Sequence, residues 1–164
     1  MYKINTIYKK LLADTTTPVS IYLRLRDVYP NSILLESSDY HSRENSMSFV
    51  CADPVAGIIL KGSRLETYFP DGSVEIKEAE NLTEQIADFK DKFIETELPE
   101  IKFISSGLFG YFTWNAVQHF EDIKFTSETP EGEEIPEMQY HLYRYIIAID
   151  HFKNEITLFK NTFD

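Results

Sequence analysis

The sequence contains one cysteine, Cys51, few basic residues and no long apolar run. A lone cysteine excludes an internal disulfide. The 16 Lys and Arg residues are outnumbered by 27 Asp and Glu residues, and the formal charge of −11 repels nucleic acids and anionic membranes. No stretch approaches the roughly 18 apolar residues of a membrane-spanning helix, and the start MYKINTIYKK lacks the apolar core of a signal peptide. We therefore expect a cytoplasmic protein that binds neither nucleic acid nor membrane.

The common catalytic signatures are missing too. The sequence has no phosphate-binding loop, no G-x-S-x-G elbow, no H-E-x-x-H pair and no paired C-x-x-C. Cys51 stands in an apolar stretch without a nearby base or cation, which favours a buried small residue over a nucleophile. A metal site would require the fold to gather histidines that are spread along the chain: His41, His119, His141 and His151. We expect no catalytic residue and no metal ligand in this chain.

Two further short motifs are more typical of structure than of catalysis. Gly107 and Gly110 in GLFGYF lack the spacing and the following lysine of a phosphate loop, and they favour a strand that packs closely on its neighbour. Asp150 and His151 would make a base with its orienting carboxylate, but adjacent strand residues point to opposite faces. We interpret this pair as the start of a turn.

The apolar content is high enough for a packed domain. With 164 residues, of which 43% are hydrophobic, the chain suits one α+β domain with its own core. Turn residues divide the apolar stretches into short segments that are typical of antiparallel strands. The unbroken aliphatic run at residues 32–38 predicts burial on both faces. We expect a predominantly antiparallel sheet formed by residues 32–38, 46–52, 56–62, 65–69, 74–79, 104–114, 140–150 and 154–163.

A few helices are expected beside this sheet. Thr17 is a suitable cap for the first helix, and Pro18 fits its first position, where no N–H is needed. Asn81 with Glu84 three residues later signals the start of a second helix. After the GLFGYF strand, apolar spacing indicates a short helix through Trp114, Val117 and Phe120.

Two segments depart from the regular pattern. Residues 124–137, KFTSETPEGEEIPE, are acidic and lack periodicity, so we expect a mobile surface loop there. The chain stops almost on its last apolar strand, at residues 154–163, which indicates either an edge strand or a polypeptide cut short.

The stretch LLES, residues 34–37, places a carboxylate and a hydroxyl at the end of an aliphatic strand. Alternation puts Leu35 and Ser37 on one face of the strand and Leu34 and Glu36 on the other. A ligand lying along it would contact an aliphatic wall, a hydroxyl and the backbone, and its ammonium would pair with Glu36 where the strand ends. This chemistry suits an amphipathic amino acid, although a plain strand end is the simpler interpretation.

Six motifs together resemble, in order and spacing, the N-terminal region of anthranilate synthase component I, which makes anthranilate from chorismate on the path to tryptophan. The resemblance extends over nearly the whole chain, so residues 1–164 are interpreted as that one domain. The motifs are TPVSIYLRLR at 17–26, LLES at 34–37, SFVCADP at 48–54, GLFGYF at 107–112, HFEDI at 119–123 and IAIDHF at 147–152.

The resemblance implies that this chain is one part of an α/β sandwich, completed by a larger C-terminal chorismate-binding domain that the chain does not contain. Chorismate, Mg²⁺ and the carboxylates that hold it would belong to that domain. No cofactor is therefore expected in this chain, and the chain alone would make no anthranilate. The implied protein partner is the glutamine amidotransferase subunit, component II.

Feedback inhibition is what the resemblance assigns to this region. L-Tryptophan, the inhibitor, would bind between the two domains, with one wall of its pocket formed by Leu35, Glu36 and Ser37. Glu36 or the nearby backbone would meet the ligand's ammonium, and Ser37 would make a hydrogen bond. Some relatives have a lysine where this chain has Met47, so Met47 can only line the pocket.

Two alternatives stay open. Aminodeoxychorismate synthase component I shares much of the same domain, although TPVSIYLRLR together with LLES favours the anthranilate branch. This chain also reads RENSMSFVC and GLFGYFTW where relatives often read RWGRYSFIG and GYFGYD. The second alternative comes from another class: a self-contained interaction module that uses its acidic surface and exposed aromatic side chains to hold a protein partner.

Overall fold

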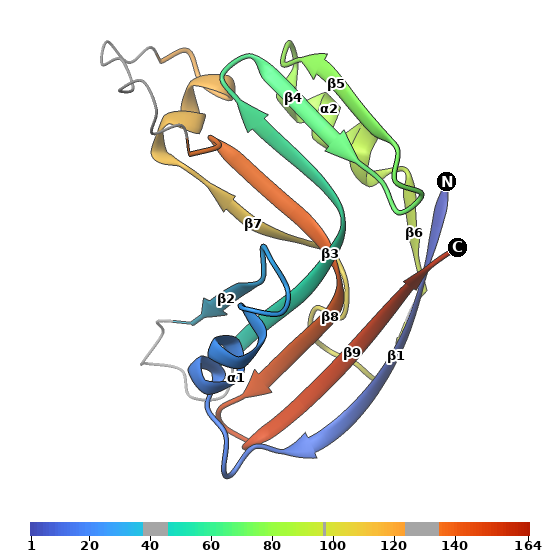
Figure 1. Ribbon diagram of the computed structural model, residues 1–164, viewed down its shortest axis with the longest axis vertical. Helices are drawn as coiled ribbons and strands as arrows, with labels where there is room; N and C mark the ends of the chain where they lie inside the picture. The colour runs from blue at the N-terminus through green and yellow to red at the C-terminus, as the bar shows by residue number, and fades with distance from the viewer. Residues whose placement is uncertain (38–45, 97, 124–134) are drawn as a thin grey trace.

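The computed structural model describes residues 1–37, 46–96, 98–123 and 135–164. The sheet in these ranges has nine strands, which are β1 (Tyr2–Leu12), β2 (Ile33–Glu36), β3 (Met47–Lys61), β4 (Arg64–Tyr68), β5 (Val74–Glu78), β6 (Phe93–Glu95), β7 (Leu108–Phe112), β8 (Met138–Asp150) and β9 (Glu155–Phe163). Their order is β5-β4-β3-β8-β9-β1-β6, with β2 added beside β3 and β7 beside β8 (Figure 1). Among the described pairs only β1 and β6 run parallel. The predicted α+β class with a predominantly antiparallel sheet is confirmed.

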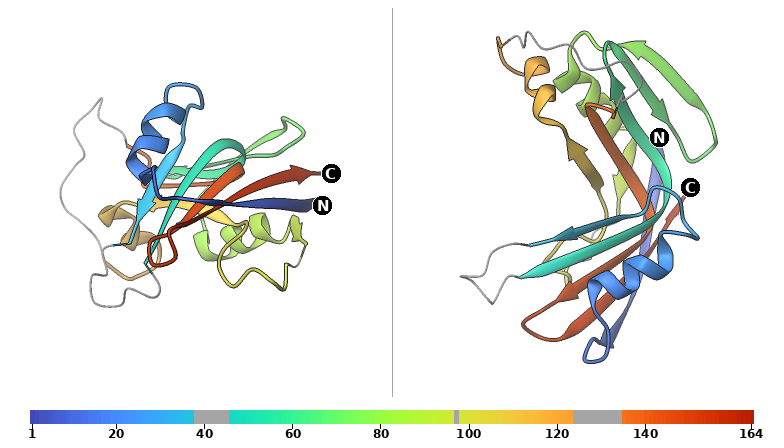
Figure 2. Two further views of the ribbon diagram at one scale, coloured as in Figure 1. Left: turned by 90° about the horizontal axis from the view of Figure 1, so that it is seen from below. Right: turned by 60° about the vertical axis from the view of Figure 1, so that its left-hand side comes forward.

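The helices begin where the sequence predicts. Helix α1 (Pro18–Leu25) is capped by Thr17, whose hydroxyl accepts from the Ser20 amide at 3.2 Å while the Ser20 hydroxyl accepts from the Thr17 amide at 3.1 Å. Helix α2 (Leu82–Lys90) is capped by the Asn81 side chain. A 3₁₀ helix, η2 (Trp114–His119), follows β7. Figure 2, seen from below, places α1 and α2 on opposite sides of the sheet.

β3 is one long strand where the sequence predicts two. Its pairing with β8 continues past Asp53 with a register shift between Pro54 and Ala56. Asp53 has a positive φ of 60°, and its carboxylate accepts from Arg144 Nε at 2.6 Å. Before the shift the odd-numbered residues of β3 join the packed core, and after it the even-numbered ones do. The register shift changes which residues of β3, odd- or even-numbered, point to the core. The alternation of apolar residues is therefore interrupted near Asp53, which explains why the sequence predicts two strands.

β3 and β8 run side by side through the middle of the sheet, and each changes its outer neighbour along its length (Figure 1). β3 pairs with β2 near its start and with β4 near its end. β8 correspondingly pairs with β7 first and with β9 later. We call the part with α2, β4, β5, β7 and residues 56–61 of β3 the α2 half. The part with α1, β2, β9 and residues 47–52 of β3 is the β2 half.

Each half has its own core cluster. In the α2 half, Leu82 and Phe89 of α2 pack on buried side chains of the sheet: Ile4, Ala56, Ile58, Leu60, Leu65, Phe69, Met138 and Leu142. The cluster of the β2 half also takes in Phe109 of β7, and it contains Cys51, Phe109, Tyr143, Ile146, Ala148 and Phe159. Half-buried side chains complete this second cluster, and they include Ile33, Leu35, Met47, Phe49, Leu98, Ile101 and Phe103.

The two glycines of GLFGYF have different structural roles. A Cβ on Gly110 would collide with the backbone of Gln139 and Tyr140 in β8, so the predicted close approach of strands is confirmed there. Gly107 instead has a φ of 133°, a conformation that favours glycine, and its Cβ position lies 3.9 Å from the Ile104 side chain. Of these two glycines, only Gly110 is therefore required by packing.

Two further predictions about strands need correction, and the strands β1 and β6 were not predicted. β2 is half-buried rather than buried on both faces, and its last residue, Glu36, is exposed. β9 is not an edge strand, since it lies between β8 and β1. The sequence reasoning missed β1, although the alternation of Tyr2, Ile4 and Thr6 is a strand signal. Most of the predicted acidic loop, residues 124–134, lies outside the described residues.

Candidate functional site

The candidate ligand residues lie together on two neighbouring strands. In the β2–β3 ladder, Leu35 pairs with Phe49 and Glu36 pairs with Ser48. Beyond the end of β2, the Ser37 amide donates to the Met47 carbonyl at 3.2 Å. The fold therefore brings Leu35, Glu36 and Ser37 next to Met47, ten residues farther along the chain.

The side chains of this segment divide between the two faces of the sheet. Leu35 and Met47 are half-buried and pack on the core cluster of the β2 half. Glu36 and Ser37 are exposed. Successive residues of a strand point to opposite faces and directly paired residues share one, so Glu36 lies on the face of its partner Ser48, opposite to Leu35. The strand end thus offers an aliphatic wall on one face and a carboxylate on the other.

Ser48 and His151 are polar neighbours of this strand end that the sequence analysis did not assign to it. Ser48 is 1% exposed, and its hydroxyl shares a hydrogen bond of 2.7 Å with His151 Nε2. The His151 amide also donates to the Ser46 carbonyl at 3.1 Å. These residues are about a hundred positions apart in the sequence, so only the register of β3 on β8 could have revealed the contact.

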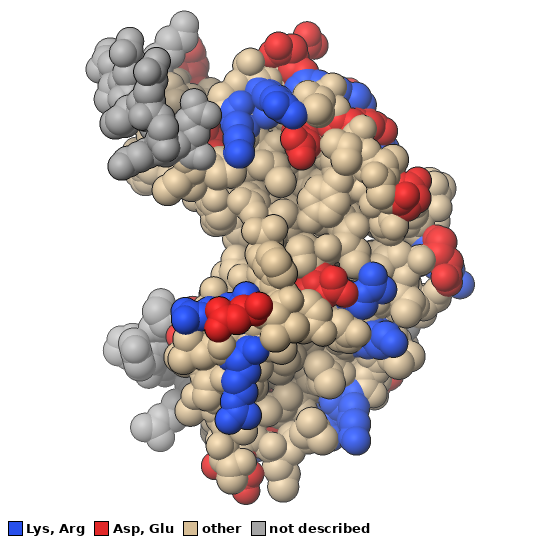
Figure 3. Space-filling model, viewed as in Figure 1, with Lys and Arg blue, Asp and Glu red and all other residues tan. Residues whose placement is uncertain are grey.

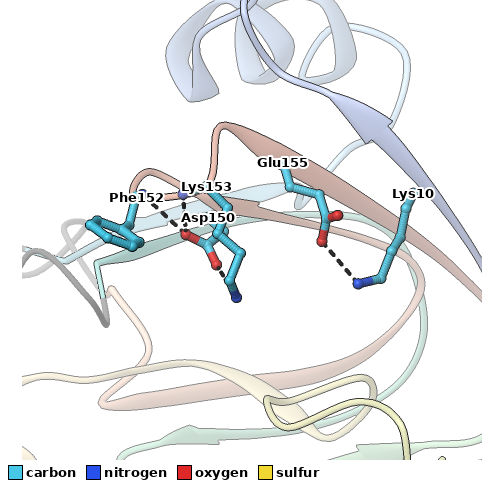
Figure 4. A network of polar contacts seen from close by, with 5 residues as sticks. All are labelled: Lys10, Asp150, Phe152, Lys153 and Glu155. Atoms are coloured by element: carbon cyan, nitrogen blue, oxygen red, sulfur yellow. Dashed lines mark hydrogen bonds and ion pairs between the residues drawn. The ribbon is translucent and has the colours of Figure 1, made fainter.

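Asp150 organises the turn that carries His151 (Figure 4). Its carboxylate accepts from the Phe152 and Lys153 amides at 3.0 and 2.9 Å and from Lys153 Nζ at 3.0 Å. Burial raises the pKa of Asp150, but the hydrogen bonds and charge of Lys153 outweigh burial and hold the pKa below its ordinary value. The interpretation of Asp150 and His151 as the start of a turn is confirmed. Just after this turn, Glu155 of β9 forms an ion pair with Lys10 of β1, with Lys10 Nζ 2.9 Å from a carboxylate oxygen.

The other histidines are separate from this site. His119 Nε2 lies 2.7 Å from a carboxylate oxygen of Glu137. His41 lies outside the described residues. Across the described ranges, no three His, Cys, Asp or Glu side chains gather as metal ligands would. Cys51 is buried, and burial raises the pKa of its thiol, so it has the character of a core residue rather than a nucleophile.

His141 is buried in the sheet next to a glycine. Its Nδ1 shares a hydrogen bond of 2.8 Å with the Tyr68 hydroxyl, and its Nε2 lies 2.8 Å from the Gln139 amide nitrogen. Gly57 sits between Tyr68 and His141 in the ladder, and a Cβ there would collide with both side chains. Burial lowers the pKa of His141 to about 4. The imidazole is therefore neutral at physiological pH, which suits a structural hydrogen bond.

A cavity of about 330 Å³ lies in the α2 half. Its lining includes Leu65 and Phe89 and the charged side chains of Glu75, Asp88 and Lys92. The candidate residues of the β2 half do not line it. This cavity is thus distinct from the strand end at Ser37.

Known proteins resemble this chain over most of its length. No protein-family model matches the chain. Anthranilate synthase component 1 of Pseudomonas putida is 26% identical over 145 residues, which cover 88% of this chain and 29% of that protein. The protein of the same name from Acetivibrio thermocellus is 24% identical over 161 residues, which cover 98% of this chain and 32% of that protein. The chain resembles anthranilate synthase component 1.

The resemblance to component 1 concerns only part of those proteins. The chain spans less than a third of the length of the two relatives named above. A solved structure, anthranilate synthase component I from Streptococcus pneumoniae TIGR4, aligns with a TM-score of 0.46 at 22% identity, covering 90% of this chain and 30% of that one. No helix in the described part of the chain is long and apolar enough to cross a membrane.

Proposed function

We propose that the chain is the N-terminal, non-catalytic domain of an anthranilate synthase component I and forms one wall of an L-tryptophan feedback site. The observation that carries this proposal is the strand end at which Leu35, Glu36 and Ser37 lie against Met47. It occurs in a chain that is similar to component 1 over most of its length.

The chemistry of the strand end fits an amphipathic amino acid. Leu35 and Met47 offer apolar surface to an indole ring, and the exposed Ser37 and Glu36 offer a hydroxyl and a carboxylate to the ligand's polar end. Glu36 is the last residue of β2 and its side chain is exposed, so its carboxylate can approach an ammonium beside the strand. Ser37 follows on the opposite face, so both groups reach one ligand only if it lies across the strand end.

A second domain is part of the proposal, and the surface of the chain supports it. Several large apolar side chains of β1 and the α1 region are exposed, among them Ile7 at 67%, Leu12 at 79% and Val28 at 65%. Figure 3 also shows a hollow beside β7 and the β2 half whose inner wall is uncharged in this view. Uncovered apolar surface favours a domain that packs against another over a self-contained interaction module.

The catalytic steps are assigned to that C-terminal, chorismate-binding domain. The acidic and histidine side chains of the described ranges do not gather into a set of ligands that fits Mg²⁺. In this proposal Mg²⁺ and chorismate are held by that second domain, and component II is the protein partner of the whole enzyme. Tryptophan bound between the domains would favour one domain arrangement, and this coupling would lower activity at the distant chorismate site.

Isothermal titration of tryptophan into the full-length protein tests the proposal. We expect saturable binding, and we expect Ser37→Ala and Glu36→Ala each to weaken it by about tenfold or more, because each removes a hydrogen bond to a charged group of the ligand. Glu95→Ala is the matched control, since Glu95 is also an exposed glutamate at the end of a short strand, β6. Unchanged affinity in both site variants would refute the site assignment.

A further inference from the structure

His151 holds the start of β3 at two points that lie on either side of Met47. Its backbone amide donates to the Ser46 carbonyl at 3.1 Å, and its side-chain Nε2 shares a hydrogen bond of 2.7 Å with the Ser48 hydroxyl. Ser48 is 1% exposed, so this hydroxyl has little access to water as an alternative partner. His151, a residue of the β8–β9 turn, therefore holds both sequence neighbours of Met47, which fixes the position of Met47.

The turn itself is well anchored. Asp150 accepts from the two amides that follow His151 and from the Lys153 ammonium, which fixes the path of residues 150–153 (Figure 4). Asp150 also pairs with Met47 in the β3–β8 ladder. The backbone that carries His151 is therefore held by the turn, and its ring is held by the Ser48 hydroxyl.

The candidate ligand segment depends on β3 for its position. Among the described residues β2 pairs only with β3, and the Ser37 amide continues this pairing by donating to the Met47 carbonyl. A displacement of Met47 would consequently move the Ser37 backbone. The route from His151 to Ser37 passes through Ser48 and Met47.

We propose that His151 is a positioning residue for the ligand site, which it preorganises by fixing Ser48 and Met47 and, through them, the Ser37 backbone. This role rests on the proposed tryptophan site for its functional meaning, but its structural part concerns this chain alone. The His151 side chain is engaged by the Ser48 hydroxyl, and it acts on the site through this contact rather than as a ligand-binding group. Its side chain shares the face of Glu36 and Ser48, opposite to that of Ser37 and Met47.

Amide hydrogen exchange in the chain of 164 residues tests the structural part without any ligand. His151→Leu removes the side-chain hydrogen bond and leaves the backbone amide in place. We expect exchange of the Ser37 amide to accelerate by about fivefold, the change that follows from losing one hydrogen bond. The Ala79 amide, which donates to the Ser63 carbonyl in the α2 half, should keep its rate. An unchanged Ser37 rate would overturn the positioning role.

Four variants separate this role from a general loss of stability. Ser48→Ala should reproduce the effect of His151→Leu, and the double variant should add nothing, because both remove the same hydrogen bond. His151→Gln, which retains a side-chain donor, should restore slow exchange at Ser37. His119→Leu is the matched control, since it removes a histidine contact of the same 2.7 Å length far from Met47. Additive effects, or an equal effect of His119→Leu, would contradict the proposal.

Tryptophan titration of the full-length variants then connects the two proposals. Given binding in the wild type, His151→Leu should raise the Kd severalfold and His151→Gln should not. Binding that is lost in Ser37→Ala but unchanged in His151→Leu would overturn the positioning role and leave the tryptophan site intact. Absence of binding in the wild type would refute the site, while the exchange rates at Ser37 would still decide whether His151 fixes the strand.

Discussion

The two halves of the sheet are built around the same pair of strands but differ in how completely they are packed. In the α2 half, β3 lies between β4 and β8 and is covered by α2, whose Phe89 is 2% exposed. In the β2 half, β3 carries a four-residue strand whose side chains are half-buried or exposed. Helix α1 contacts β2 and β3, yet its Val19 and Leu23 are 45% and 47% exposed.

This difference separates a region that stabilises the chain from one that is available for recognition. The aromatic side chains of the α2 half contact each other in a closed cluster, in which Phe69 lies 5.6 Å from Phe89 and 6.5 Å from Phe93 between ring centroids. The strand end at Ser37 combines exposed polar groups, Glu36 and Ser37, with the half-buried apolar side chains of Leu35 and Met47. Binding sites commonly combine such partly open surface with a rigid support.

The largest expected difference between the halves is in how much the free energy of unfolding falls when an apolar side chain is truncated. Phe69→Ala should lower the free energy of unfolding by about 3–5 kcal/mol, because the ring is 4% exposed and Lys92 lies over it at 4.3 Å. Leu35→Ala should cost less than about 2 kcal/mol, since its side chain is only half-buried. Urea denaturation of both variants measures this. Equal costs would contradict the comparison.

A second prediction concerns the pH dependence of the sheet at His141. Burial lowers the pKa of His141 in the folded chain from its ordinary value of 6.5 to about 4, so the unfolded chain binds more protons between these pH values. The buried, neutral His141 ring contributes about 3 kcal/mol to the free energy of unfolding. This contribution is fully present above pH 6.5, falls as the pH approaches 4 and is absent below pH 4. The stability difference between wild type and His141→Gln, measured by urea titration from pH 7 to 4, should shrink accordingly. A constant difference would show that His141 is not buried as a neutral ring.

The helix caps should contribute similarly in the two halves. Thr17→Ala and Asn81→Ala each remove a side-chain acceptor from the first turn of α1 or α2, and each should cost about 1 kcal/mol. Thermal unfolding followed by circular dichroism measures both. Because the local capping energy does not depend on the packing of the rest of the helix, a much larger loss for Asn81→Ala would mean that α2 detaches as a unit.

The smallest effect is expected on the exposed rim of the β2 half. Lys10 forms its ion pair with Glu155 at the surface, where solvent screens the attraction. Lys10→Ala should leave the urea midpoint unchanged within error, whereas Asp150→Asn in the nearby turn should lower it. A fall for Lys10→Ala as large as that for Asp150→Asn would indicate that the ion pair is part of the anchored turn.

Local signals predicted most of the elements. Thr17 with Pro18 and Asn81 with Glu84 fix the helix starts, because capping depends on residues within one turn. The β4–β5 hairpin and the β8–β9 turn were likewise readable. The failures occurred where distant parts of the chain decide, as at the register shift of β3 and the placement of β9 between β8 and β1.

The candidate site divides in the same way. LLES marked Leu35, Glu36 and Ser37 as a strand end with ligand-binding chemistry, because residue types and alternation are properties of the sequence. Met47 could be related to them only through the resemblance. Ser48 and His151 were missed, since their contact depends on the pairing of β3 with β8, which no local pattern encodes.

The sequence by itself determined the caps, the turns, the apolar content and the charge of this protein, because these depend on residue type and short spacing. Tertiary structure alone decided that one strand replaces two at Asp53, that β2 stays half-covered, and that His151 reaches Ser48. Each of these depends on which strands lie side by side. That choice is made by the burial of two core clusters as a whole, so it cannot be read from any single stretch of residues.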